Sequence, residues 1–206
     1  MPHSIESKQA QVRFYFDFLS PYAYLAHHHL VDLSASHGWH IDYCSIDLGR
    51  AKKAIGNVGP ANRDMPVKLT YLKKDLYRWA ALYGVALAFP PNYNSSRLNV
   101  GLYYGRCQGR EADYVRTAFG LVWGHGKAPD DPQTLETVAR QMQWDPDDFA
   151  RFTQSESGLQ AYNDSTEEAV ARQVFGVPTM VVGAEMWWGN DRLFFLEKYL
   201  NQETQK

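Results

Sequence analysis

The chain has 206 residues, of which 45% are hydrophobic and 21% are charged, and its formal net charge at pH 7 is -2. This length accommodates one large domain or one domain with an inserted subdomain, and the near-neutral charge gives no electrostatic reason to expect nucleic acid as a partner. No segment approaches the ~20 apolar residues of a membrane span, and the first residues lack the apolar stretch of a secretory signal. We therefore expect a cytoplasmic protein that binds neither membrane nor nucleic acid.

The N-terminal part of the chain predicts a parallel strand-helix-strand unit. Residues 12–18 alternate apolar and polar side chains with the period of two that is typical of a strand. Ser20 and Pro21 then provide a cap and a first-turn proline for a helix that Gly38 ends. Residues 40–47 predict a second strand, so the connection between the two strands is a helical crossover.

The middle of the chain lacks strand-like alternation and carries helical stripes instead. Apolar side chains recur at spacings of three and four residues. The stripes are Leu69, Leu72, Leu76, Trp79 and Tyr83; Ala112, Val115, Phe119 and Val122; and Leu135, Val138 and Met142. A short helix begins at Asp145-Pro146, and a longer one is expected over about 156–173.

Strands return near the C-terminus, where residues 178–182 are apolar and β-branched and residues 185–188 can pair back across a Gly-Ala turn. A last helix follows. The order of elements predicts an α/β protein with a thioredoxin-like fold and a large all-helical insertion.

The predicted domains follow from this order of elements. Residues 12–49 together with 174–201 form the discontinuous thioredoxin-like domain, and residues 50–173 form the helical insertion domain. Residues 1–11 are expected to be a disordered N-terminal tail.

The junction at Ser20 is the first candidate site. A loop that opens a helix presents free backbone N–H groups and a positive helix end, which stabilise anions such as a thiolate. Thioredoxin-like redox proteins carry C-x-x-C here, whereas this chain has Ser20-Pro21-Tyr22-Ala23. A dithiol cycle is therefore excluded. The Ser20 hydroxyl either only caps its helix or donates to a sulfur that a ligand brings in.

Two further segments complete a possible cleft. In the thioredoxin arrangement, the loop at Val177-Pro178 carries a cis-proline and leaves the Val177 backbone open to an extended peptide, and glutathione is such a peptide. Asn190 or Asp191 either caps the last helix or helps to hold the charged end of an amino-acid-like ligand. Together with Ser20, these segments predict a cleft for a thiol tripeptide.

Several segments carry a family resemblance. They are Phe14-Tyr15-Phe16-Asp17-Phe18-Leu19-Ser20-Pro21; Ile55 to Pro60 with Asn62-Arg63-Asp64; Phe89-Pro90 with Asn92-Tyr93-Asn94; and Phe175 to Met180 with Met186 to Leu193. This combination resembles the 2-hydroxychromene-2-carboxylate isomerase family, which belongs with the kappa-class glutathione transferases. The resemblance extends from about Val12 to the last helix.

The resemblance implies a homodimer with glutathione as a cofactor and a small aromatic carboxylate as the substrate. Ser20 matches the family's catalytic, glutathione-activating serine. The positions that match its glutathione-binding residues are Val177, Trp188, Gly189, Asn190 and Asp191. The positions that match its substrate-binding residues are Lys52, Asn62 and Tyr93.

The implied reaction is the isomerisation of 2-hydroxychromene-2-carboxylate to trans-o-hydroxybenzylidenepyruvate, as in naphthalene-type breakdown of aromatic hydrocarbons. One alternative is a kappa-class transferase that conjugates glutathione to electrophiles, since only the acid pocket separates the two. A non-enzymatic thioredoxin-like binding module is a second alternative. The run His27-His28-His29 does not predict a metal site, because consecutive helical residues point in different directions. Cys44 and Cys107 are too far apart in the sequence to suggest a metal or redox pair.

Overall fold

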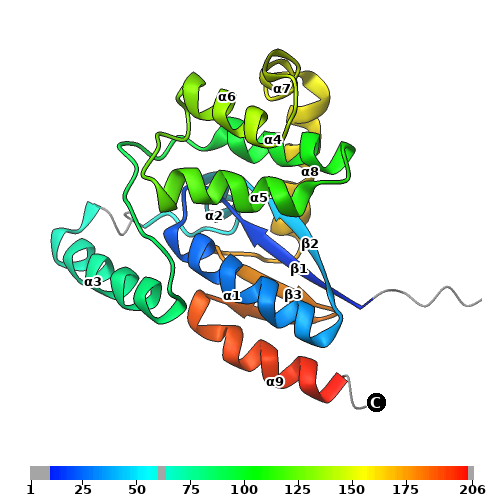
Figure 1. Ribbon diagram of the computed structural model, residues 1–206. Helices are drawn as coiled ribbons and strands as arrows, with labels where there is room; N and C mark the ends of the chain where they lie inside the picture. The colour runs from blue at the N-terminus through cyan, green and yellow to red at the C-terminus, as the bar shows by residue number, and fades with distance from the viewer. Residues whose placement is uncertain (1–9, 60–63, 204–206) are drawn as a thin grey trace, which may run out of the picture.

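The computed structural model describes residues 10–59 and 64–203, which contain a four-stranded mixed sheet covered by helices (Figure 1). The strands lie in the order β2-β1-β3-β4. Their bounds are Gln11–Phe16 for β1, His40–Ser45 for β2, Thr179–Val182 for β3 and Glu185–Trp188 for β4. β2 is parallel to β1, whereas β3 is antiparallel to β1 and β4 is antiparallel to β3. The predicted thioredoxin-like fold is confirmed.

The alternation in β1 distributes its side chains over the two faces of the sheet. Phe14 and Phe16 are fully buried in the larger core cluster, with side chains from helices that include α1 (Pro21–His37). Tyr15 is buried on the opposite face in a smaller cluster with Cys44 and Val181. A sheet that is buried on both faces provides a rigid base for the loops at its edge.

Helix α1 begins and ends where the sequence predicts. Ser20 is its N-cap, Pro21 is its first residue, and Gly38 follows its last turn with φ of 68°. This left-handed backbone favours glycine, because a Cβ would crowd the following carbonyl. The helix connects β1 to β2, so that the parallel crossover is formed as expected.

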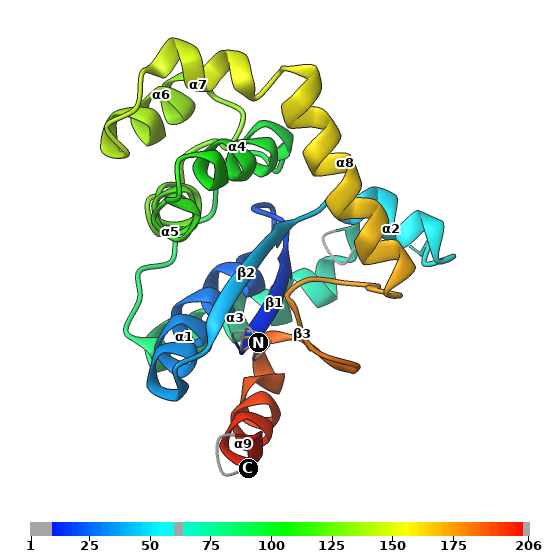
Figure 2. The same cartoon turned by 90° about the vertical axis from the view of Figure 1, so that its right-hand side faces the viewer.

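A block of helices separates β2 from β3 in the sequence. Their bounds are Leu48–Ala54 for α2, Pro66–Tyr83 for α3, Ser96–Cys107 for α4, Glu111–Phe119 for α5, Pro132–Gln141 for α6, Pro146–Phe152 for α7 and Glu156–Ala171 for α8. A π-helical segment, Gly120–Gly124, continues α5. Helices α4 to α7 lie together beyond one end of the sheet, and α8 leads from them back to the sheet (Figure 2), where it packs on the face that carries Tyr15. The sequence stripes did not identify α2 or α4 as separate helices.

The C-terminal part completes the sheet. A cis peptide bond joins Val177 to Pro178, and Gly183, with φ of 59°, turns the chain between β3 and β4. A 3₁₀ turn, Asn190–Arg192, leads into α9 (Leu193–Glu203), which packs on the same side as α1.

The predicted N-terminal tail and the predicted site residue Asn62 lie wholly or mostly outside the described residues. β1 begins at Gln11, which pairs with His40, so the strand includes the last residue of the expected N-terminal tail. The rest of that tail up to residue 9, and Asn62, lie outside the described residues. The exact division into 12–49 with 174–201 and 50–173 stays a prediction. None of the helices within 10–59 and 64–203 is long and apolar enough to cross a bilayer.

Candidate active site

Ser20 lies at the point where β1 has ended and α1 begins, and it is almost fully buried. Its Oγ accepts a hydrogen bond from the Ala23 N–H at 3.2 Å, so the capping role is present. Within the described part of the chain, the Ser20 hydroxyl donates to no acceptor and the Tyr22 N–H has no partner. Pro21 has no N–H. The first turn of α1 therefore keeps one hydroxyl and one peptide donor for an anion.

Asp17 holds the loop that carries Ser20. Its buried carboxylate accepts hydrogen bonds from the Leu19 N–H at 3.1 Å, the Asn99 Nδ2 at 2.8 Å and the Ser95 hydroxyl at 2.5 Å. The N–H of Leu48, at the start of α2, approaches it at 3.4 Å. Burial raises the pKa of Asp17, and these hydrogen bonds oppose that shift. This one side chain thus connects the Ser20 loop to α2 and α4.

A cavity of about 350 Å³ opens beside Ser20, between the starts of α1 and α2 and the first half of α3. Its wall brings together four of the residues singled out from the sequence, which are Ser20, Lys52, Tyr93 and Val177. Most of the rest of the wall is apolar, with Leu19, Pro21, Leu48, Leu69, Leu72, Leu76, Phe89 and Trp123. We refer to this space as the aromatic cavity.

The name reflects three ring systems in its wall. The Tyr93 and Trp123 rings lie 6.1 Å apart and are tilted by 31°, and the Phe89 ring meets Trp123 edge-on at 6.0 Å. The Trp123 indole N–H donates to the carbonyl of Phe18 at 2.8 Å, which fixes the wall against the loop before Ser20. Such a surface suits a flat aromatic ligand.

A second cavity, of about 500 Å³, lies on the other side of Tyr22 and Val177. It is lined by Trp188, Gly189, Asn190 and Asp191, together with Tyr71, Asp75, Trp79, Pro178 and Arg192. We refer to it as the peptide groove. Tyr22 and Val177 line both cavities, so the two spaces adjoin near Ser20.

The Val177 backbone is open in this groove. Within the described residues, neither its N–H nor its C=O makes a hydrogen bond, whereas the next carbonyl, of Pro178, accepts from the Gly189 N–H at 2.9 Å. Gly176 is required beside it, because a Cβ there would collide with the Trp188 indole nitrogen. The loop therefore presents the unpaired backbone N–H and C=O of one residue to an extended ligand, next to an indole that is half exposed.

The far end of the groove carries charge. Asp191 forms an exposed ion pair with Arg192 at 3.1 Å. Asn190 is buried instead, and its Oδ1 accepts from the Tyr83 hydroxyl at 3.2 Å, while its Nδ2 has no partner among the described residues. The Asn190 side chain thus connects this loop to α3. The charged side chains that line the groove are those of Asp191, Arg192 and Asp75.

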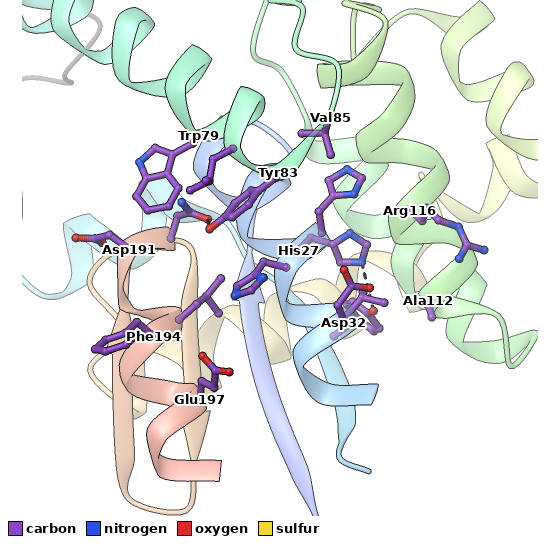
Figure 3. A pocket seen from close by; sticks show the side chains of 17 residues that line it. His27, Asp32, Trp79, Tyr83, Val85, Ala112, Arg116, Asp191, Phe194 and Glu197 are labelled. Atoms are coloured by element: carbon purple, nitrogen blue, oxygen red, sulfur yellow. Dashed lines mark hydrogen bonds between the residues drawn. The ribbon is translucent and has the colours of Figure 1, made fainter. Parts of the chain in front are cut away.

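A larger cavity, of about 770 Å³, adjoins the peptide groove (Figure 3). It shares Trp79, Asn190 and Asp191 with the peptide groove and is otherwise lined mainly from α1, α3 and α9. His27 in its wall is buried against Phe14 and Phe119, and burial lowers its pKa to about 3. No cluster within the described ranges could hold a metal ion. Because Ser20 lines the aromatic cavity, and the peptide groove adjoins that cavity at Tyr22 and Val177, we place the candidate active site at these two spaces.

Sequence reasoning missed three residues that the structure brings to these spaces. Lys73 and Trp123 line the aromatic cavity, and Tyr22 separates it from the peptide groove. A signal for Lys73 is its spacing, because it follows Leu69 by four residues and therefore lies on the same helical face. The indole of Trp123 had no such signal, because only the fold brings residue 123 to the Ser20 loop.

Known proteins share this fold and much of this sequence. The model of the DsbA-like thioredoxin domain family matches residues 11–201. A 2-hydroxychromene-2-carboxylate isomerase from Pseudomonas putida is 52% identical over 191 residues, which cover 93% of this chain and 94% of that protein.

The chain belongs to the 2-hydroxychromene-2-carboxylate isomerase family. A solved structure of 2-hydroxychromene-2-carboxylate isomerase superposes with a TM-score of 0.90 at 52% identity, covering 93% of this chain and 95% of that one. A more distant relative, glutathione S-transferase kappa 1 of Caenorhabditis elegans, is 24% identical over 95% of this chain and 92% of its own length. The similarity to these proteins therefore extends over nearly the whole of this chain.

Proposed function

We propose that this protein isomerises 2-hydroxychromene-2-carboxylate to trans-o-hydroxybenzylidenepyruvate with glutathione as its cofactor. The observation that carries the proposal is the pair of adjoining cavities that meet near Ser20, one aromatic and one suited to a peptide. The names of the relatives at high identity support the reaction. The absence of a thiol at Ser20 supports the need for a cofactor that brings one.

The peptide groove fits glutathione in its chemistry. Val177 offers an unpaired peptide N–H and C=O, and Asp191 and Arg192 offer one charge of each sign for an amino-acid-like end. Trp188 and Gly189 also line this groove. When bound, glutathione supplies a thiolate that adds reversibly to the conjugated double bond, so that the bond can rotate.

The protein has to stabilise that thiolate. A thiol with a pKa of ~8.5 is only a few per cent ionised at neutral pH, and lowering this pKa to ~6.5 corresponds to ~2.7 kcal/mol. A hydroxyl hydrogen bond to a charged acceptor contributes ~1.5–3 kcal/mol, and a helix N-terminus adds ~0.3–1 kcal/mol. The Ser20 hydroxyl and the start of α1 are therefore sufficient in magnitude.

The aromatic cavity is the proposed substrate site. Lys52 is a half-buried cation at its edge and suits the carboxylate of the acid. Tyr93, tilted against Trp123, suits the aromatic ring. Asn62 is assigned to the same acid from the family resemblance alone.

An absorbance assay tests the proposal. The purified protein is mixed with 2-hydroxychromene-2-carboxylate, with and without glutathione at a small fraction of the substrate concentration. We expect rapid conversion only when glutathione is present, with all of the glutathione recovered at the end. Equal rates with and without glutathione would contradict the cofactor role, and no conversion in either case would contradict the reaction.

A kappa-class transferase activity is the second candidate, supported by the distant relative of that name. The same thiolate site would serve it. Stoichiometric loss of glutathione with an electrophile, and formation of a stable conjugate, would favour this function over isomerisation.

The wider setting stays a prediction from the family resemblance. It comprises a homodimer in the cytoplasm that acts in naphthalene-type breakdown of aromatic hydrocarbons. Light scattering on the purified protein tests the dimer.

A further inference from the structure

Two ammonium groups from different helices line the aromatic cavity. Lys52 comes from α2 and Lys73 from α3. Neither of them pairs with a carboxylate anywhere in residues 10–59 and 64–203. The remaining wall is mostly apolar, and a cation beside an apolar wall gains most from an anionic group on a ligand. The proposed substrate has one carboxylate, so one of the two cations has no assigned partner.

Lys73 occupies a position where the helix otherwise presents leucine. Leu69, Leu72 and Leu76 lie on the same face of α3, and all three line the cavity. Lys73 and the adjacent Lys74 are both exposed, but only Lys73 lines the cavity. Lys73 thus lies at the rim of the cavity with its ammonium accessible to a ligand, whereas Lys74 lies outside the cavity.

An aromatic ring holds the Lys73 ammonium at this wall. Its Nζ lies 5.6 Å from the centroid of the Phe89 ring, which is a favourable cation–π distance. Phe89 itself packs edge-on against Trp123. A substrate ring that packs against these aromatic side chains with its oxygen substituent toward α3 would bring that oxygen close to the ammonium.

We propose that Lys73 is a substrate-contacting residue that donates a hydrogen bond to the ring oxygen of the chromene, which becomes the phenolic oxygen of the product. The inference rests on the proposed function. When the chromene opens, the bond between C2 and the ring oxygen breaks and its electron pair goes to that oxygen. The O–H electrons of the C2 hydroxyl form the ketone, and the released proton neutralises the phenolate. The Lys73 ammonium stabilises the charge on the oxygen before that proton arrives.

The test follows the phenol of the bound product, without glutathione. The product trans-o-hydroxybenzylidenepyruvate is titrated with alkali in the presence of excess protein, and the absorbance change on phenolate formation gives the pKa of the bound phenol. In the unmodified protein, we expect the acid dissociation constant to be roughly tenfold larger than that of the free product, because the ammonium favours the anion. Lys73→Met should abolish this increase, Lys73→Arg should retain most of it, and Lys74→Met should leave it unchanged.

A second measurement separates this contact from binding of the carboxylate. We expect Lys73→Met to lower kcat/KM roughly tenfold for the hydroxylated substrate and less than twofold for cis-benzylidenepyruvate, which lacks the phenolic oxygen. Equal losses for both substrates, or an unchanged phenol pKa in Lys73→Met, would overturn the proposal for Lys73. If the unmodified protein does not isomerise either compound, the proposed function fails instead, and this outcome is distinct.

Discussion

At the residue scale, the Ser20 hydroxyl in the first turn of α1 has two roles. Ser20 Oγ accepts from the Ala23 N–H, and its proton remains available to an anion. Replacing Ser20 by alanine removes both contributions. A second serine, Ser155, caps α8 in the same way by accepting from the Gly158 N–H and does not line either cavity.

We therefore predict that Ser20→Ala lowers turnover by about tenfold or more and raises the thiol pKa of bound glutathione, measured by thiolate absorbance against pH. Both Ser20→Ala and Ser155→Ala should lose about 1 kcal/mol of unfolding free energy, because each removes a cap. Only Ser20→Ala should lose activity. Equal activity of the two variants would remove Ser20 from the chemistry and leave it as a cap.

His27 is a second residue with a testable property, because it is a base whose side chain is almost fully buried. Burial is the main cause that lowers its pKa to about 3, with smaller contributions from His28 and Arg116. The unfolded value is 6.5, so the unfolded chain binds more protons between these two values, and acid favours unfolding.

The stabilising effect of neutral His27 is thus complete above pH 6.5 and is lost as the pH falls toward 3. We predict that His27→Gln flattens the decrease of unfolding free energy in this window, by up to about 1.4 kcal/mol for each pH unit, as measured by denaturant titration. His40→Gln, at an exposed position of β2, should keep the original slope. If the two variants keep the same slope, His27 is not the acid-sensitive group.

Much of the candidate site could be predicted from the sequence. The N-cap at Ser20, the Val177-Pro178 loop and the segment from Trp188 to Asp191 lie at chain positions that are fixed by the order of elements. Lys73 was not found, because a lysine on a helix predicts solvent unless the surface opposite is known.

At the scale of elements, α4 shows why a helix can lack a recognisable apolar stripe in the sequence. It is surrounded by other elements, with buried residues on several faces that include Asn99 and Gly101. A helix buried on several sides has no single apolar stripe. Helix α3 is the opposite case, because its sequence has a clear apolar stripe. Only Leu76 and Ala80 of this helix are buried, whereas Leu69 and Leu72 line the cavity. Periodicity reveals an apolar face and leaves open whether protein or a ligand covers it.

Gly101 is the position where the packing of α4 can be tested. A Cβ there would overlap the Tyr114 hydroxyl and approach the Phe149 ring at 2.8 Å. The Tyr114 hydroxyl donates to the Leu98 carbonyl at 2.6 Å, so the glycine leaves room for this hydrogen bond.

We predict that Gly101→Ala lowers the unfolding free energy by about 1–3 kcal/mol, because the core at the junction of α4, α5 and α7 becomes overpacked. Gly120→Ala is the matched control, since its Cβ would meet nothing within 4 Å and its backbone is helical. That variant should be neutral or up to about 1 kcal/mol more stable. Thermal or urea unfolding that ranks the two variants the other way would contradict the packing account.

At the scale of the whole molecule, α3 is hydrogen-bonded to the thioredoxin-like part at two places that border the cavities. The Tyr22 hydroxyl donates to Asp75 at 2.7 Å, and the Tyr83 hydroxyl donates to Asn190 at 3.2 Å. Asp75 lies on the peptide groove, and Tyr22 lies between the two spaces. The position of α3, and with it the outer wall of the aromatic cavity, depends on these contacts.

We predict that Tyr22→Phe lowers the unfolding free energy by about 1.5–3 kcal/mol, as for a hydrogen bond to a charged group. It should also accelerate amide hydrogen exchange in α3 and raise KM for the aromatic acid more than it changes kcat. Tyr77→Phe is the control, because Tyr77 is an exposed tyrosine of the same helix whose hydroxyl makes no hydrogen bond within residues 10–59 and 64–203, and whose ring meets Phe89 edge-on. Unchanged exchange in α3 of Tyr22→Phe would show that other contacts hold the helix.

The pairing of β1 with β3 also determines when the sheet can be completed during synthesis of the chain. Phe14 lies opposite Met180, so the two strands at the centre of the sheet come from nearly opposite ends of the chain. While the ribosome is still translating the helical block, β1 can pair only with β2, and its other edge has no neighbour. The nascent polypeptide therefore has an unprotected strand edge until β3 emerges, which is the condition under which aggregation competes with folding and chaperones act.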